Sequence, residues 1–283
     1  MSELDEIQHL LHSLGEIRNI MSAMKNIALM EIRKLTRFTA AQSRVVENIE
    51  TAAADFLNFY GPMPLPVAAS PLVYILVGSE RGFCGDFNES AVGMLEKQVQ
   101  TAAGAHKPLL IAVGQRLTGK LPPSCELEAQ LEGPSVAEEV PAVIGRLLDK
   151  LSDLQRRLAC LFPLTVIHHL SGDEEKTVAS VLEPFRERPP GSKRFTYPPL
   201  LNLSPQTLFA DLVDHYLFAV LFEIFYGSLM AENRRRTQHM EGAIRRLDER
   251  HTELTLKLNT LRQEQITEEI EIIMLSAEGA RKR

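Results

Sequence analysis

Apolar residues recur every seven positions near the N-terminus, and this pattern constrains the fold more than any other feature of the chain. Two such series run together, and one acidic residue falls within them. Their members are Ile7, Leu14, Met21, Ala28 and Leu35 in one series and Leu10, Ile17, Met24, Glu31 and Phe38 in the other. The first proline is Pro62, so we predict one helix of about 55 residues within residues 1–60, roughly 80 Å long.

The C-terminal region has the same periodicity, with apolar steps that alternate between four and three residues. The series consists of Met240, Ile244, Leu247, His251, Leu254, Leu258, Leu261 and Gln265. Proline is absent from Gln206 onward, which predicts a second helix of about 75 residues within 205–283, roughly 110 Å long. A sustained repeat of 3.5 residues favours a left-handed supercoil. We therefore expect the two helices, with matching seams and comparable lengths, to pair antiparallel as a coiled coil.

The segment between the two helices, residues 61–204, has a different pattern. Three short β-rich runs lie at 72–77, 109–113 and 163–169, and helical patterns lie between them at about 88–103 and 135–160. Residues 183–199 are typical of a loop. Alternating strands and helices indicate a small open α/β domain with a mostly parallel sheet. The predicted fold class is α/β with long helices. In this fold, the α/β domain is inserted in the chain between the two long helices that form the coiled coil.

Composition narrows the class of function. The chain has 283 residues and a net charge of −6, whereas a nucleic-acid binder usually presents a basic face. Its three cysteines, Cys84, Cys125 and Cys160, form no CxxC pair, which favours a reducing compartment over a disulfide scaffold or a zinc site. The start, MSELDEIQHLL, is acidic where a secretory signal is basic, and no run of about 20 apolar residues occurs. We expect a soluble chain on the cytosolic side of a membrane.

The stretch VGSERGFCGDFNES, residues 77–90, lies between a predicted strand and a predicted helix, where phosphate-binding loops occur. Its glycines, Gly78, Gly82 and Gly85, do not have the spacing of a Walker loop or a dinucleotide fingerprint. The residue after Gly85 is Asp86, whose carboxylate would repel phosphate. We therefore interpret the stretch as a tight turn between strand and helix, and we predict no cofactor.

Other polar residues were weighed as sites and favour structural roles. Cys84 is more typical of a buried thiol than of a nucleophile, because nothing in the sequence brings His106 near it. His168 and His169 are adjacent on a predicted strand and so face opposite sides, which favours a packing or solvent role over metal binding. Residues 173–175 are typical of a solvated turn. No catalytic or metal-ligating residue is predicted.

Six arginines cluster on the C-terminal helix, where residues 231–262 carry eight basic and five acidic side chains. They are Arg234, Arg235, Arg236, Arg245, Arg246 and Arg250. Two interpretations remain open: an ordinary charged helix face, or a collar that faces acidic loops of a partner.

Three stretches of the chain resemble, in order and separation, motifs of the gamma subunit family of F-type ATP synthases. IRNIMSAMKNIALMEIRK (17–34) is similar to the family's first helical block through Ile20, Ala23, Met24, Ala28, Arg33 and Lys34. SERGFCGDFN (79–88) is similar to the family's S-x-R-G-L-C-G-x-L-N motif through Ser79, Arg81, Gly82, Cys84, Gly85 and Asn88. AENRRRTQHMEGA and LNTLRQEQITEEI resemble its C-terminal signatures through Glu232, Arg236, Met240, Ala243, Asn259, Arg262, Gln263, Ile266, Thr267 and Glu269.

The resemblance implies a rotor shaft. In this family an antiparallel coiled coil stands inside a hexamer of alpha and beta subunits, and the α/β domain lies near the epsilon subunit and the ring of c subunits. The family converts ion-driven rotation into ATP synthesis or hydrolysis on the beta subunits. For this chain it implies a peripheral place on the cytoplasmic side of a bacterial inner membrane, with no cofactor and no catalytic site of its own.

The resemblance also implies residue roles. Met24, Lys25, Arg262 and Gln263 would contact the beta subunits, Arg236, Met240 and Glu269 would support the coil and coupling, and Arg81, Gly82, Cys84, Gly85 and Asn88 would mark the foot domain. The chain departs from the family pattern at Glu80, at Asp86, in the ending IEIIML and at Lys25, where the family has an acid. These departures fit a divergent or second-operon, Na⁺-translocating type.

Two other classes of function were considered. A catalytic α/β enzyme with helical arms would need a phosphate loop or a clustered acid and base. A structural coiled-coil adaptor would account for the two long helices but not for the spacing of the three motifs.

Overall fold

The computed structural model describes residues 3–61, 63, 71–102, 107–158, 162–170, 176–185 and 196–281, with side chains described as far as Met274. The described chain forms two compact units. The coil unit comprises Met1–Ile27 and Thr237–Arg283, and the sheet unit comprises Ala28–Arg236. His106, Cys160 and the predicted turn at residues 173–175 lie outside the described residues.

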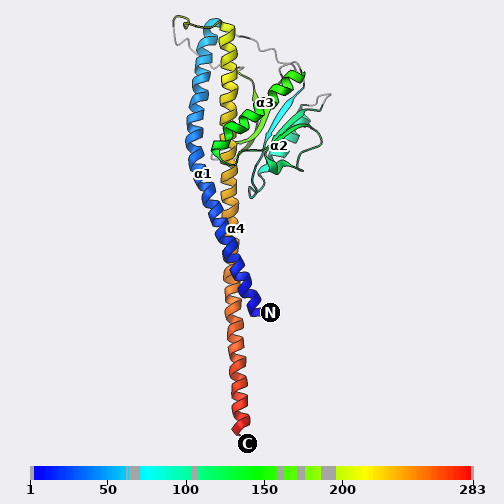
Figure 1. Ribbon diagram of the computed structural model, residues 1–283, viewed down its shortest axis with the longest axis vertical. Coiled ribbons are helices and arrows are strands. Elements are labelled where there is room, and N and C mark those ends of the chain that lie inside the picture. Colours follow the sequence, from blue (N-terminus) through cyan, green and yellow to red (C-terminus); the bar gives the residue numbers. More distant parts are fainter. Residues whose placement is uncertain are drawn as a thin grey trace. The chain divides into compact units, whose positions relative to one another are not determined.

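Two long helices account for the ends of the chain, as predicted. Helix α1 runs from Glu3 to Tyr60 over 58 residues, and helix α4 runs from Pro205 to Arg281 over 77 residues (Figure 1). Helix α1 ends at Gly61, which adopts a φ of 76° and donates its N–H to the Leu57 carbonyl at 2.9 Å, a conformation that glycine adopts readily. Helix α4 starts with Pro205 after Ser204, whose hydroxyl accepts the Thr207 N–H at 3.1 Å.

Within the coil unit, the two helices pack antiparallel along an apolar seam. Ile7 of α1 is buried against Leu254 and Leu258 of α4, and half-buried leucines extend this cluster. These leucines are Leu4, Leu11, Leu14 and Leu261. The first predicted series of α1 is therefore confirmed at Ile7 and Leu14. The predicted series of α4 is confirmed at Leu254, Leu258 and Leu261, whereas its polar members His251 and Gln265 are exposed.

The second predicted series of α1 was wrong as a seam at Leu10 and Ile17, in the coil unit. Leu10 and Ile17 are 45% and 46% exposed, because the seam uses the positions three residues before each member of the first series instead of three residues after. Two of those seam positions are polar and pair across the helices. Arg18 Nε lies 2.5 Å from Asp248 Oδ1, and Lys25 Nζ lies 3.8 Å from Glu241 Oε1.

The two helices differ in length about as predicted, with 58 residues in α1 and 77 in α4. Leu261 is the last side chain of α4 in the seam cluster, and the described side chains from Arg262 to Met274 are all exposed. Since α1 is shorter by 19 residues, the end of α4 continues without a described partner helix in this chain.

The sheet unit contains a five-stranded sheet in the order β3-β2-β1-β4-β5. Its strands are β1 (Val73–Val77), β2 (Leu109–Val113), β3 (Glu126–Leu131), β4 (Leu164–Leu170) and β5 (Lys176–Leu182). Strands β1, β2, β3 and β4 pair in parallel, and β5 pairs antiparallel with β4. The three predicted strands and the mostly parallel sheet are confirmed, and the two edge strands are additional.

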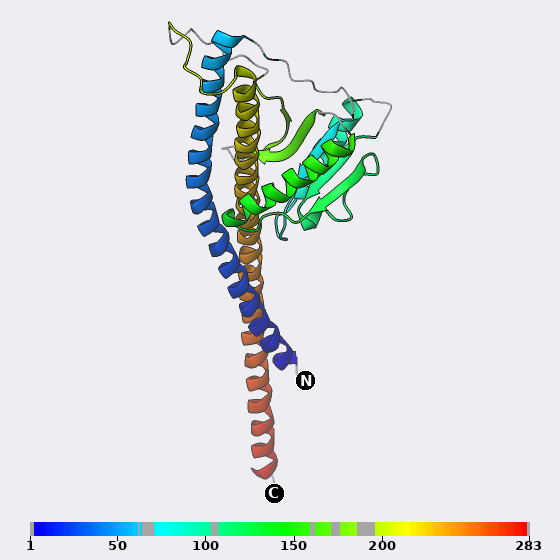
Figure 2. The same ribbon diagram turned by 45° about the horizontal axis from the view of Figure 1, so that its top comes forward.

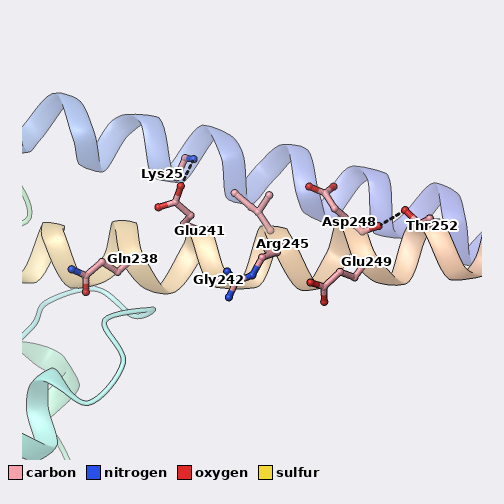
Figure 3. A pocket seen from close by; sticks show the side chains of 9 residues that line it. Lys25, Gln238, Glu241, Gly242, Arg245, Asp248, Glu249 and Thr252 are labelled. Carbon is pink, nitrogen blue, oxygen red and sulfur yellow. Dashed lines mark hydrogen bonds and ion pairs between the residues drawn. The ribbon is translucent and has the colours of Figure 1, made fainter.

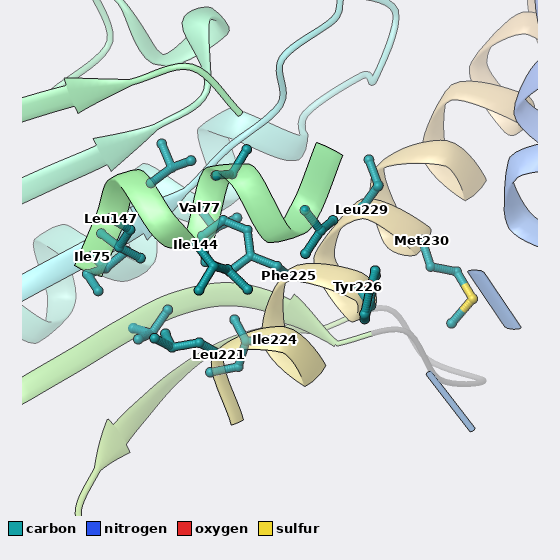
Figure 4. Packing of buried hydrophobic residues seen from close by; sticks show 14 of the residues in the cluster. Ile75, Val77, Ile144, Leu147, Leu221, Ile224, Phe225, Tyr226, Leu229 and Met230 are labelled. Atoms are coloured by element: carbon teal, nitrogen blue, oxygen red, sulfur yellow. The ribbon is translucent and has the colours of Figure 1, made fainter. Parts of the chain in front are cut away.

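Helices cover both faces of this sheet, as Figures 1 and 2 show. Helix α2 (Phe87–Thr101) packs on one face through Ala91 and Leu95. Helix α3 (Val140–Leu158), preceded by a short 3-10 turn at Ala137–Glu139, packs on the other. Side chains of α4, including Leu221 and Phe225, enter this second core together with Leu35 of α1 (Figure 4). The sheet unit therefore has a core on each face of the sheet, and segments of both long helices contribute to the one on the α3 side.

No helix in the described ranges is apolar over a length that could cross a membrane. The parts of the predicted 183–199 loop that the structure describes, residues 183–185 and 196–199, contain neither helix nor strand.

Candidate functional site

The stretch from Ser79 to Phe87 forms the turn that connects the end of β1 to the start of α2. Its backbone twice enters the left-handed region, with φ of 65° at Phe83 and 59° at Gly85. Glycine is suited to such a position because it has no Cβ to clash with the backbone. The predicted tight turn between strand and helix is confirmed.

Asn88 holds the two ends of this turn together. Its side-chain oxygen accepts the Ser79 N–H at 2.9 Å, and its side-chain N–H donates to the Ser79 hydroxyl at 2.9 Å. Both residues are buried, so each polar group needs the partner that the other supplies. This is the structural role of two residues in the signature motif.

Charged residues of the turn bind the neighbouring strand ends. Glu80 Oε2 accepts the N–H groups of Gln115 at 3.0 Å and Gly133 at 2.8 Å, which follow β2 and β3. Arg81 Nε donates to the Ser135 hydroxyl at 3.2 Å. The turn therefore lies at the carboxyl ends of three parallel strands, where α/β proteins usually bind their ligands.

Side chains of α4 occupy this edge of the sheet. The Glu232 carboxylate accepts the backbone N–H groups of Glu80 and Arg81, as a bound anion would, and forms an ion pair with Arg236. Arg236 Nε donates to the Gly82 carbonyl at 3.3 Å. Glu232 and Arg236 are 3% and 6% exposed, so the pair is buried against the turn.

Cys84 lies beside this ion pair and is buried, as predicted. Arg236 Nη2 lies 3.4 Å from its sulfur, and the thiol lies 3.3 Å from the Arg81 carbonyl. Burial, with a smaller effect of the nearby Glu232 carboxylate, raises the pKa of the Cys84 thiol to about 11. The thiol therefore stays protonated at neutral pH, unlike a cysteine nucleophile.

The histidine pair of β4 packs inside the sheet unit. His169 stacks on Phe87 with ring centroids 3.7 Å apart, and its Nε2 lies 3.2 Å from the Ser90 hydroxyl. On the other face, His168 Nε2 lies 2.9 Å from the Ser180 hydroxyl. Burial lowers the pKa of each histidine to about 4, so both are neutral at pH 7. Of the two predicted roles, the structure has the packing role.

The predicted partner contacts on α1 and α4 lie in the coil unit. Met24, a predicted contact, is half-buried. Met240, which the resemblance assigns to the coil and coupling, is buried. Lys25, paired with Glu241, borders a groove of about 780 Å³ that also includes Arg245 and Asp248 (Figure 3). The groove is lined by charged side chains of both signs, which gives this part of the coil a polar surface.

The other predicted contacts lie on the α4 segment beyond Leu261. Arg262 and Gln263 are exposed there. Glu269, which the resemblance assigns to the coil and coupling, is exposed on the same segment. Ile266 and Ile270, on the same segment, are 55% and 52% exposed. This segment therefore presents both charge and apolar surface.

The arginine cluster is divided by the structure. Arg236 faces the turn and is buried, and Arg235 Nη1 lies 3.1 Å from Asp86 Oδ1 of the turn. Arg245, Arg246 and Arg250 are exposed in the coil unit. Of the six arginines in the cluster, only these three are exposed enough to face acidic loops of a partner, as the collar interpretation requires.

The sequence did not predict that α1 contacts the segment before α3, in addition to the contact of α4 with the β1–α2 turn. The buried Glu31 Oε1 accepts the Ala137 N–H at 2.6 Å at the start of the 3-10 turn before α3. Lys34 lies 3.1 Å from Glu31 and 2.7 Å from Glu138. The signal was present as the one acidic residue in an otherwise apolar series.

Comparisons with known proteins follow this architecture closely. A family model described as ATP synthase matches residues 3–279. The ATP synthase gamma chain of Clostridium beijerinckii is 24% identical over 279 residues and covers 95% of each chain. That of Acetivibrio thermocellus is 25% identical over 313 residues and covers 99% of each chain.

Solved structures share the fold. A chain in the OSCP/F1/c-ring structure of the Euglena gracilis mitochondrial ATP synthase has a TM-score of 0.61 at 16% identity, covering 99% of this chain and 96% of that one. A chain in the central stalk/c-ring structure of the Tetrahymena thermophila enzyme has a TM-score of 0.51 at 14% identity, covering 79% and 99%.

Proposed function

The chain belongs to the ATP synthase gamma chain family, and we propose that it acts as the rotor shaft in the central stalk of a rotary ATP synthase. It couples ion flow through a membrane ring to ATP synthesis or hydrolysis on beta subunits. The observation that carries this proposal is the family match from residue 3 to residue 279, which spans both long helices and the sheet between them.

The coil unit has properties that suit a shaft. Its seam of interlocked apolar side chains resists bending and unwinding better than a loop-rich structure would. Ion pairs between the two helices flank this seam, with Lys257 Nζ 2.7 Å from Glu3 Oε1 and Arg18 Nε 2.5 Å from Asp248 Oδ1. Charged outer faces attract a surrounding subunit without fixing one register, which favours rotation.

The proposed partners are the alpha and beta subunits around the coil, and the epsilon subunit and the c-subunit ring near the sheet unit. The similar Euglena and Tetrahymena chains come from structures described as F1/c-ring and central stalk/c-ring, which supports this assignment. Met24, Lys25, Arg262 and Gln263 are the proposed contacts with the beta subunits. Arg262 and Gln263 are exposed, as such contacts require.

We assign the chain no catalytic site. The edge of the sheet where an α/β enzyme would bind its substrate holds the Glu232–Arg236 pair, and Cys84 beside it is buried. Its place in the cell would be peripheral, on the cytoplasmic side of a bacterial inner membrane, through its contacts with the rest of the complex.

Co-expression with alpha and beta subunits tests the function. We expect the chain to co-purify with them in a complex that hydrolyses ATP, and the purified chain alone to have no such activity. ATP hydrolysis by the chain alone would contradict the proposal. Association that leaves the hydrolysis rate of the alpha and beta subunits unchanged would instead indicate a structural adaptor.

Met24→Lys tests the proposed contact with the beta subunits. The new charge lies next to Lys25, so it should disturb the contact and lower the number of ions pumped per ATP hydrolysed more than it lowers assembly. Met30→Lys is the matched control, because Met30 lies on the same helix and is 70% exposed. Unchanged ATP-driven pumping by Met24→Lys would remove Met24 from the contact.

A further inference from the structure

The Glu232–Arg236 ion pair is unusual because both residues belong to one helix and yet are buried. Their side chains are 4% and 7% exposed, although residues four apart on a helix can pair equally well in water. Burial of a charge is unfavourable unless its remaining hydrogen-bonding groups find partners. Asn233 Oδ1 on the same helix accepts one Arg236 N–H at 2.9 Å, and the remaining partners of the pair lie outside the helix.

The turn between β1 and α2 supplies those partners. The Glu232 carboxylate accepts the N–H groups of Glu80 and Arg81. Arg236 donates to the Gly82 carbonyl at 3.3 Å and has its Nη2 3.4 Å from Cys84 Sγ. Glu232 and Arg236 thus bind the same segment, residues 80–84. Glu232 binds it through two backbone amides, and Arg236 binds it through a carbonyl and a thiol.

Other contacts between α4 and the turn are weaker. The Asp86–Arg235 pair has side chains 68% and 33% exposed, and exposed pairs contribute little. Ala231 contributes a small apolar contact with Cys84 and Phe87. Burial raises the pKa of Glu232 to about 7, while Arg236 and the two amides act in the opposite direction. Separation of the turn from α4 would leave two charges without these partners, so this pair opposes the separation.

We propose that Glu232 and Arg236 are positioning residues that lock the β1–α2 turn onto α4, so that torque carried by α4 reaches the sheet unit without slip. The inference rests on the proposed function, because only a rotating α4 places a load on this contact. Torque reaches the contact along one continuous helix, since α4 extends from the sheet unit into the coil unit.

Cys84 offers a direct probe of this lock. It is 5% exposed, and its thiol contacts both members of the pair, at 3.4 Å from Arg236 and 3.9 Å from Glu232. A maleimide can reach the sulfur only when the turn separates from α4. In a background with Cys125→Ser and Cys160→Ser, the labelling rate of Cys84 therefore reports how often the lock opens.

The experiment uses the assembled, membrane-bound complex that contains this chain and compares Glu232→Gln with the parent. Glu232→Gln keeps the shape of the side chain but leaves Arg236 buried without a counter-charge. We expect Cys84 labelling to accelerate about 100-fold or more, and the number of ions pumped per ATP hydrolysed to fall while hydrolysis continues. Arg246→Met is the matched control on the same helix, because Arg246 is exposed.

Two further variants separate positioning from folding. Arg236→Met is milder, because Glu232 can become neutral by binding a proton, and it carries the test if Glu232→Gln does not assemble. The double variant Glu232→Gln/Arg236→Met removes both charges, so labelling and pumping should both return toward the parent values.

The outcomes are distinct. Labelling and the pumping ratio should change together across the three variants. Faster labelling with an unchanged pumping ratio, or unchanged labelling in Glu232→Gln and Arg236→Met, would overturn the lock. Failure of the parent chain to assemble with alpha and beta subunits would instead overturn the proposed function.

Discussion

Leu258→Ala should loosen the coil unit, because Leu258 is buried in its seam. Leu258 is 7% exposed and packs against Ile7 of α1. Leu256, two residues earlier on the same helix, is 65% exposed. The pair Leu258→Ala and Leu256→Ala therefore makes the same chemical change at a buried and at an exposed position.

The expected magnitude follows from burial. A leucine truncated in a core costs about 2–5 kcal/mol, and a narrow seam between two helices should lie at the lower end, about 2 kcal/mol. At about 1.4 kcal/mol for each factor of ten, this makes opening of the seam about 30-fold more frequent. Leu256→Ala removes little buried area, and alanine favours the helix slightly more, so we expect less than about 0.5 kcal/mol.

Amide hydrogen exchange of the full-length chain measures this difference directly. Amides of α1 near Ile7 and of α4 near Leu254 should exchange about 30-fold faster in Leu258→Ala and at nearly the parent rate in Leu256→Ala. Because α1 and α4 share this seam, both helices should respond to a change made in one. Equal exchange rates in the two variants, or a response confined to α4, would refute the paired seam.

Two further predictions concern the sheet unit. Gly114 has a φ of 118°, and a Cβ there would lie 2.8 Å from the Gly78 carbonyl oxygen, so Gly114→Ala should cost at least about 2 kcal/mol of unfolding free energy in urea titrations. Gly119→Ala, at a φ of 78° in open space, should cost only about 1 kcal/mol, and equal losses would contradict the steric reasoning. The pKa of His168 is about 4 in the folded chain and 6.5 in its ordinary state. The unfolded chain therefore binds this proton first as the pH falls below 6.5, and up to about 3 kcal/mol of unfolding free energy is lost by pH 4. His168→Gln should reduce the loss of unfolding free energy between pH 7 and 4.5, and an unchanged pH dependence would exclude His168 as its cause.

The sequence predicted the long helices well because their signals are local and repeated. The predicted ranges 1–60 and 205–283 contain helices Glu3–Tyr60 and Pro205–Arg281, and prolines and glycines mark their ends. Periodicity alone could not show whether the seam of α1 uses the positions three residues before or three residues after each member of the first series. Arg18 and Lys25 look unsuited to a seam until Asp248 and Glu241 are known to lie opposite them.

The two edge strands were missed because their patterns are weak. Strand β3, Glu126–Leu131, places Glu126 and Glu128 in a six-residue element, and it is paired only with β2. Strand β5 follows residues typical of a turn and is half-buried along most of its length. An edge strand with one neighbour carries fewer apolar residues than the central β1, all of whose residues are buried.

The candidate site was predictable as a motif but not as an arrangement. The turn, the buried thiol of Cys84 and the glycine at position 85 follow from local sequence. The partner of the turn does not, since Arg236 is separated from Gly82 by 154 residues. A buried acid such as Glu232 or Glu31 looks like a surface residue until the amides that it binds are placed.

Rotation of this chain inside its complex is the most direct test of the account. A bead attached through Lys150→Cys, an exposed position on α3, with Cys125→Ser and Cys160→Ser, would report motion of the sheet unit while the alpha and beta subunits are fixed to a surface. We predict that ATP drives stepwise rotation of the bead in one direction. ATP hydrolysis at the normal rate with a stationary bead would contradict the central claim that this chain is the rotor shaft.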